Sequence, residues 1–117
     1  MSSRVLIVDP DPSVRRLLVA LMRRAGYLTD AAEDQEEALA LHRRLPHDAV
    51  IVEPRNLGGA ALLEKLDDGT ANLIVVTTPD GVTIPYRDTR GVRTVLFKPF
   101  RIDDLAAAVA SCCDGAN

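Results

Sequence analysis

Apolar residues along the chain follow two alternating patterns. Short continuous runs rich in Val, Ile and Leu are typical of strands buried on both faces of a parallel sheet. These runs lie at residues 5–8, 49–52, 73–77 and 94–97, with a weaker one at 27–32. Between most of them, apolar residues recur every three or four positions, as on one face of a helix. Because this alternation is typical of βαβ units, we predict an α/β fold: a doubly wound, flavodoxin-like parallel sheet of five strands.

The helical stretches have recognisable start and stop signals. Asp11, which a proline follows, is a good N-cap for a helix over residues 13–25, and Gly26 ends that helix. Further helices are predicted over residues 33–45, 58–66 and 103–112. The second of these places Leu45 on its inner face. Residues 79–92 read PDGVTIPYRDTRGV and show no helical stripe, so we predict that a loop or a broken helix replaces the fourth helix of the pattern.

The composition of the chain limits its domain organisation and its binding partners but does not indicate a function. With 117 residues, the chain is predicted to form one domain over residues 1–117 with a core that needs no disulfide. The 14 basic and 17 acidic residues leave a net charge of −3, which predicts no binding to nucleic acid or to an acidic membrane. Arg15, Arg16, Arg23 and Arg24 are expected on a solvated helix face, and His42 and His47 are expected to be solvated as well. Adjacent cysteines near the C-terminus and the lack of a long apolar span favour a cytoplasmic setting.

Chemically distinctive side chains follow the predicted strands. They are Asp9, Asp11, Glu53, Thr77 and Lys98. In a doubly wound sheet the functional site lies beyond the carboxyl ends of the strands, so residues far apart in sequence meet there. Carboxylates can hold Mg²⁺ or accept a phosphoryl group, and a hydroxyl and an ammonium can neutralise phosphoryl oxygens. The set therefore points to phosphoryl chemistry.

Four segments resemble the landmark segments of response-regulator receiver domains: VLIVDPDPSVRRLL, HDAVIVEP, LIVVTT and LFKPF. The resemblance implies a domain that accepts a phosphoryl group from a sensor kinase on an Asp after the third strand. It also implies that Asp9 is the first residue of an acidic pair, that Thr77 is the switch hydroxyl and that Lys98 is the site lysine. The Lys98–Pro99 bond is expected to be cis, as is common in this family.

The chain departs from the receiver pattern at four places. Pro10 stands at the second acidic position, Glu53 at the phospho-acceptor position and Val95 at the aromatic switch position, and the PRNLGG loop is about two residues shorter than usual. Proline cannot bind a metal, so we expect no resident cofactor and impaired Mg²⁺ binding, with Asp9 and Glu53 as weak candidate ligands. Asp11 could replace the lost ligand, but the N-cap interpretation is favoured.

Two interpretations of Glu53 remain open. Its carboxylate either imitates the charge of a phosphorylated aspartate or belongs to a drifted site in which it pairs with Lys98. In both cases we expect a receiver domain that is not an enzyme and signals without phosphorylation. Its expected partner is a protein: a sensor kinase, an output domain, another signalling protein or a second copy of the chain.

The competing hypothesis is a small phosphohydrolase. The Asp9-Pro-Asp11-Pro-Ser segment resembles the opening motif of haloacid-dehalogenase-like enzymes, in which the first Asp is the nucleophile and the second the acid/base. The chain is short for such an enzyme, and no acidic pair ends a later strand. The receiver hypothesis is therefore favoured.

Overall fold

The computed structural model describes residues 3–79 and 86–114. Its strands are β1 Arg4–Val8, β2 Leu28–Ala32, β3 Ala49–Val52, β4 Leu73–Thr77 and β5 Val92–Phe97. Its helices are α1 Pro12–Arg24, α2 Gln35–Arg44, α3 Ala60–Leu66 and α4 Ile102–Asp114, with a short 3-10 helix at Tyr86–Asp88. The strands form one parallel sheet in the order β2-β1-β3-β4-β5. The predicted doubly wound architecture is confirmed.

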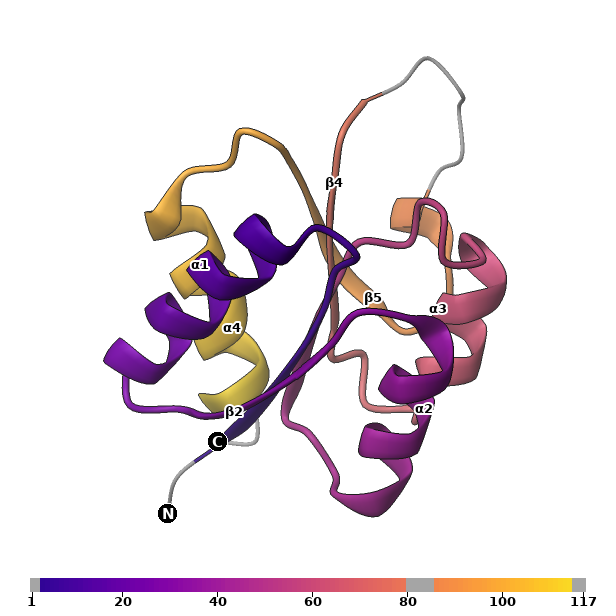
Figure 1. Ribbon diagram of the computed structural model, residues 1–117, viewed down its shortest axis with the longest axis horizontal. Coiled ribbons are helices and arrows are strands. Elements are labelled where there is room, and N and C mark those ends of the chain that lie inside the picture. The colour runs from indigo at the N-terminus through magenta and orange to yellow at the C-terminus, as the bar shows by residue number, and fades with distance from the viewer. Residues whose placement is uncertain (1–2, 80–85, 115–117) are drawn as a thin grey trace.

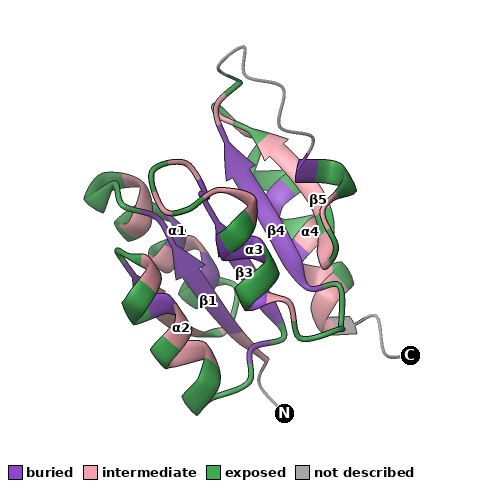
Figure 2. Ribbon diagram, turned by 90° about the vertical axis from the view of Figure 1, so that its right-hand side faces the viewer, coloured by how far each residue is buried: buried purple, intermediate pink, exposed green. Residues whose placement is uncertain are grey.

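The sheet separates two apolar layers. Helices α2 and α3 cover one face of the sheet, and α1 and α4 cover the other (Figure 1). Leu6 and Val50 pack with side chains of α2 and α3, and Ile7 and Ile51 pack with side chains of α1 and α4. Strands β1, β3 and β4 are buried, whereas the edge strand β5 is only partly covered (Figure 2). Continuous Val, Ile and Leu runs form these inner strands because both faces of each strand meet a helix layer.

The boundaries of the predicted helices agree with the structure to within two residues, and one packing prediction is wrong. Leu45 ends α2 in an extended conformation and is 42% exposed, because the helix stops at Arg44 and no longer carries Leu45 on its inner face. The prediction for residues 79–92 falls partly on residues 80–85, which lie outside the described residues. Beyond them the chain forms the 3-10 helix, and Tyr86 packs against the core on the α3 side.

Two further features of the structure concern the peptide bond after Lys98 and the lengths of the helices. The Lys98–Pro99 peptide bond is cis, as the resemblance predicted. Within residues 3–79 and 86–114, none of the helices has the length and hydropathy needed to cross a membrane.

Candidate functional site

An ammonium group lies between two buried carboxylates at the carboxyl edge of the sheet. Val8 lies opposite Val52 in the parallel register, so Asp9 and Glu53 leave adjacent strands side by side. The Nζ atom of Lys98, which follows β5, is 3.0 Å from Asp9 Oδ2 and 3.5 Å from Glu53 Oε1. The two acids are only 2% and 4% exposed. Since a buried charge is costly unless it is paired, the Lys98 ammonium offsets part of the cost of burying these two carboxylates.

A second cation, Arg55, also binds Glu53. Its Nε atom is 3.3 Å from Glu53 Oε1, and its backbone N–H donates to Glu53 Oε2 at 3.3 Å. Its Nη2 atom donates to Thr78 Oγ1 at 3.3 Å. Arg55 therefore connects the end of β3 with the end of β4 through Glu53. The hydrophobic pattern does not mark Arg55, although an arginine two residues after a carboxylate at a strand end is a signal that could have pointed to it.

Asp9 is also held from the α1 side. Its Oδ1 atom accepts a hydrogen bond from the Asp11 N–H at 2.8 Å, and its carbonyl oxygen accepts one from Arg15 Nη1 at 2.8 Å. Arg15 also lies 3.8 Å from a carboxylate oxygen of Glu33. Of the four arginines expected on a solvated face of α1, Arg16, Arg23 and Arg24 are exposed, but the expectation is wrong for Arg15, because the first turn of α1 carries its side chain back over the end of β1.

Asp11 does not join the two buried acids. Its Oδ1 atom accepts from the backbone N–H groups of Ser13 and Val14 at 2.9 and 3.4 Å, and so caps α1. The N-cap interpretation is confirmed. Pro10, between the two aspartates, is exposed and offers no donor to this site.

The two threonines after β4 lie in different surroundings. Thr77 is 3% exposed, and within the described part of the chain its Oγ1 atom has no hydrogen-bond partner. Thr78 accepts the hydrogen bond from Arg55. The assignment of Thr77 as a switch hydroxyl therefore stays a prediction. Val95 is partly buried against the core on the α3 side.

Within residues 3–79 and 86–114, neither Asp9 nor Glu53 belongs to a cluster of three metal-ligating groups. Among the described residues, the single group of that size consists of the exposed Glu33, Asp34 and Glu37 at the start of α2. Exposed acidic side chains at a helix N-terminus stabilise the helix without any ion.

The structure also corrects the expectation for the two histidines. The side chain of His47 is fully buried and that of His42 is 11% exposed. They contact each other and two aspartates at the opposite, amino edge of the sheet. The loop position of His47 suggested solvent, but the residue lies two positions before β3, and its side chain is buried.

Comparison with known proteins assigns the family. Residues 5–110 match the family model of the response regulator receiver domain. The chain belongs to the response regulator receiver family. Receiver domains of this family are signalling modules of two-component systems.

Relatives of the receiver domain include longer regulators. The DNA-binding response regulator MtrA of Mycolicibacterium smegmatis is 28% identical over 93% of this chain and 50% of its own length. A response regulator receiver protein of Anaeromyxobacter sp. is 34% identical over 85% of this chain and 44% of its own length. The chain thus spans about half the length of these two relatives.

Solved structures support the same fold. A putative response regulator from Chloroflexus aurantiacus superposes with a TM-score of 0.83 at 23% identity, covering 97% of this chain and 99% of the other. The signal receiver domain of an HD domain-containing protein from Pseudomonas fluorescens superposes with a TM-score of 0.85 at 20% identity, covering 97% and 88%.

Proposed function

We propose that this receiver domain signals through protein–protein contact without a phosphorylation cycle. The observation that carries the proposal is the charge balance at the acceptor position. Within the described part of the chain, two buried carboxylates, Asp9 and Glu53, face two cations, Lys98 and Arg55, so the charges of these four side chains balance without any added ion or phosphoryl group. Residues that would otherwise neutralise an incoming phosphoryl group are already paired with carboxylates of the chain itself.

The donors around Asp9 do not fit a magnesium ion. Mg²⁺ requires nearly octahedral oxygen coordination and is usually held by one or two carboxylates with their oxygens available. Both carboxylate oxygens of Asp9 already accept hydrogen bonds, one from the Asp11 N–H and one from Lys98. Pro10 supplies no oxygen from its side chain, and Glu53 is paired with two cations. We therefore propose that Mg²⁺ binding is impaired and that the metal plays no part in signalling.

Glu53 provides a permanent connection between the ends of β3 and β4, in place of one that would form and break with phosphorylation. Its carboxylate reaches Thr78 through Arg55, which joins the ends of β3 and β4. This arrangement supports the interpretation of Glu53 as a permanent substitute for a charged acceptor more than that of a carboxylate paired with Lys98 alone. The surface near these strand ends is then held in one state, and a protein partner reads that state.

The partner we propose is a sensor kinase, an output domain or another signalling protein, or a second copy of the chain. Each relative above is roughly twice as long as this chain, and one is named as a DNA-binding regulator. Attachment to, or contact with, an output domain of that kind is consistent with the proposal. DNA binding by residues 3–114 is not part of it, because the charge of the chain is −3.

The test is direct phosphorylation. The protein is incubated with Mg²⁺ and acetyl phosphate, or with Mg²⁺ and beryllofluoride, and followed by intact-mass spectrometry and by ¹H–¹⁵N NMR. We expect no mass increase and no shifts beyond those caused by Mg²⁺ alone. The matched variant carries Pro10→Asp and Glu53→Asp, which restore both acids, and it should gain Mg²⁺-dependent shifts. A stoichiometric acylphosphate on the unmodified protein would overturn the proposal.

The hydrolase hypothesis has a separate test. Its proposed acid/base, Asp11, is committed to capping α1, which disfavours that role. We expect no turnover of p-nitrophenyl phosphate with Mg²⁺ present. Turnover that Asp9→Asn abolishes would contradict this expectation.

A further inference from the structure

Two histidines face each other nitrogen to nitrogen at the amino edge of the sheet. The Nδ1 atoms of His42 and His47 are 3.1 Å apart, the ring centres are 5.4 Å apart, and the planes differ by 25°. The distance between the ring centres thus exceeds the distance between the two nitrogens by about the diameter of one imidazole ring. Both nitrogens must then lie close to the line that joins the centres, with each in-plane bonding direction aimed at the other ring.

This geometry suits one shared proton. A neutral imidazole has one N–H donor and one acceptor nitrogen, so an N–H of one ring can donate to the bare nitrogen of the other. A bridging zinc ion would need to lie about 2.0–2.1 Å from each nitrogen. Because the nitrogens are only 3.1 Å apart, such an ion would lie off the line that joins them, away from the in-plane bonding directions of both rings. A fully protonated pair would instead bring two N–H groups face to face.

The outer nitrogens of the pair face carboxylates. His47 Nε2 lies 2.8 Å from Asp30 Oδ2 on β2, and His42 Nε2 lies 3.8 Å from Asp68 Oδ2 in the turn after α3. The first contact requires a proton on His47 Nε2, which leaves His47 Nδ1 as the acceptor and His42 Nδ1 as the donor. The second is too long for a hydrogen bond, so His42 Nε2 needs no proton. One proton on each ring is therefore enough to complete the hydrogen bonds of the closed pair.

The other charges around the pair do not favour positive charge on both imidazole rings. Arg4 on β1 lies 3.1 Å from Asp30 and binds the same oxygen as His47. Its backbone N–H donates to Asp48, which follows His47. Burial lowers the pKa of His47 and outweighs the opposing effect of Asp30, while His42 and Arg4 lower it further. On α2, Arg43 and Arg44 are exposed neighbours of His42 that add positive charge.

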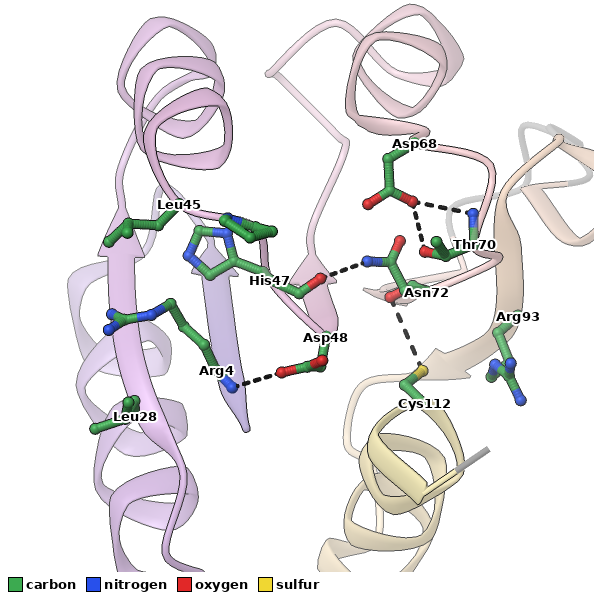
Figure 3. Close-up of a pocket in the computed structure, with 11 residues that line it drawn as sticks. Arg4, Leu28, Leu45, His47, Asp48, Asp68, Thr70, Asn72, Arg93 and Cys112 are labelled. Carbon is green, nitrogen blue, oxygen red and sulfur yellow. Dashed lines mark hydrogen bonds between the residues drawn. The ribbon is translucent and has the colours of Figure 1, made fainter. Parts of the chain in front are cut away.

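We propose that His42 and His47 form an acid-sensitive closure that holds residues 45–48 against the sheet. The histidine pair links α2 to this segment, Asp30 links the segment to β2, and Asn72 Nδ2 donates to the His47 carbonyl oxygen at 2.8 Å. His47 and Asn72 line a pocket of about 720 Å³ between Leu45 on one side and Cys112 on the other (Figure 3). When both rings become imidazolium, their hydrogen bond is lost, the segment is released and this pocket widens. The inference does not depend on the proposed function.

The shared proton is tested by NMR on ¹⁵N-labelled protein. At neutral pH we expect a through-hydrogen-bond coupling between the two Nδ1 nuclei, with His47 in the Nε2–H form and His42 in the Nδ1–H form. Both histidines in the Nε2–H form, with no coupling between them, would overturn the proposal.

The closure is tested by hydrogen exchange of the Asp48 amide, which donates to the Arg4 carbonyl oxygen at 2.8 Å in the closed form. Opening takes up two protons, so its equilibrium constant should rise about a hundredfold per pH unit below about 6.5. In His42→Asn, whose amide can keep the donor but cannot titrate, the rise should be about tenfold per unit. Equal pH dependence in the two proteins would overturn the proposal. Circular dichroism at each pH separates local opening from global unfolding, and opening that occurs only with global unfolding also overturns it.

Discussion

Replacing Lys98 by methionine removes the ammonium between two buried carboxylates and keeps most of the side-chain stem. Its side chain is 21% exposed, whereas those of Asp9 and Glu53 are 3% and 4% exposed, so solvent screens this cluster only weakly. We expect Lys98→Met to lower the free energy of unfolding at neutral pH by about 3 kcal/mol, because truncating one partner of a buried ion pair leaves the other charge uncompensated.

The two contacts of Lys98 should contribute unequally. At an effective dielectric constant of about 20, the attraction is about 5.5 kcal/mol at the 3.0 Å distance to Asp9 and about 4.7 kcal/mol at the 3.5 Å distance to Glu53, before desolvation is subtracted. Glu53 also keeps Arg55 when Lys98 is lost, whereas the Asp9 carboxylate, among the described residues, keeps the hydrogen bond from the Asp11 N–H and no ion pair. The coupling energy of Lys98 with Asp9 should therefore exceed that with Glu53.

The assay is a pair of double-mutant cycles in urea unfolding at pH 7, followed by far-UV circular dichroism. One cycle combines Lys98→Met with Asp9→Asn, and the other combines it with Glu53→Gln. Unequal coupling energies, with the larger for Asp9, are the expected result. A loss of less than about 1 kcal/mol for Lys98→Met, typical of an exposed pair, would refute the reasoning, as would a larger coupling with Glu53.

Three further changes test the fold and the caps by urea or thermal unfolding. Leu62→Ala truncates a fully buried side chain on α3 and should lower the free energy of unfolding by about 2–5 kcal/mol. Its control, Leu17→Ala, truncates a half-exposed side chain on α1 and should lower it by under about 0.5 kcal/mol. Similar losses for the two variants would contradict the assigned core. Asp11→Ala should cost about 1 kcal/mol through loss of the α1 cap, and Asp11→Asn should largely retain it. Asp30→Asn tests a pH dependence. Burial alone would raise the pKa of Asp30, but hydrogen bonds from His47 and the nearby guanidinium hold it below its ordinary value of 3.8. The ionised form therefore contributes stability above pH 3.8 that is lost as the pH falls through the lower, folded-state pKa. The deficit of Asp30→Asn relative to the unmodified protein should shrink in that acidic range, and a deficit independent of pH would argue against the contact.

The hydrophobic pattern by itself determined the order and type of the elements. Continuous apolar runs marked β1, β3 and β4 because strands covered on both faces need apolar side chains at every position. Asp11 with its following proline marked the start of α1, since capping depends on residues adjacent in sequence. The receiver resemblance singled out Glu53 and Lys98, whose charged groups lie 3.5 Å apart in the structure.

Only the tertiary structure decided which charges meet. Arg55 and Arg15 reach Glu53 and Asp9 because strand register and helix entry bring their side chains back over the strand ends. The histidine pair forms because α2 and the segment before β3 fold toward each other, whereas its carboxylate contacts come from β2 and the α3–β4 turn. Hydrophobic periodicity indicates on which face of its own helix or strand each residue lies. Charge pairing depends instead on the positions of atoms that several elements contribute. The neutral cluster at the carboxyl edge and the buried histidines at the amino edge are for that reason properties of the folded chain.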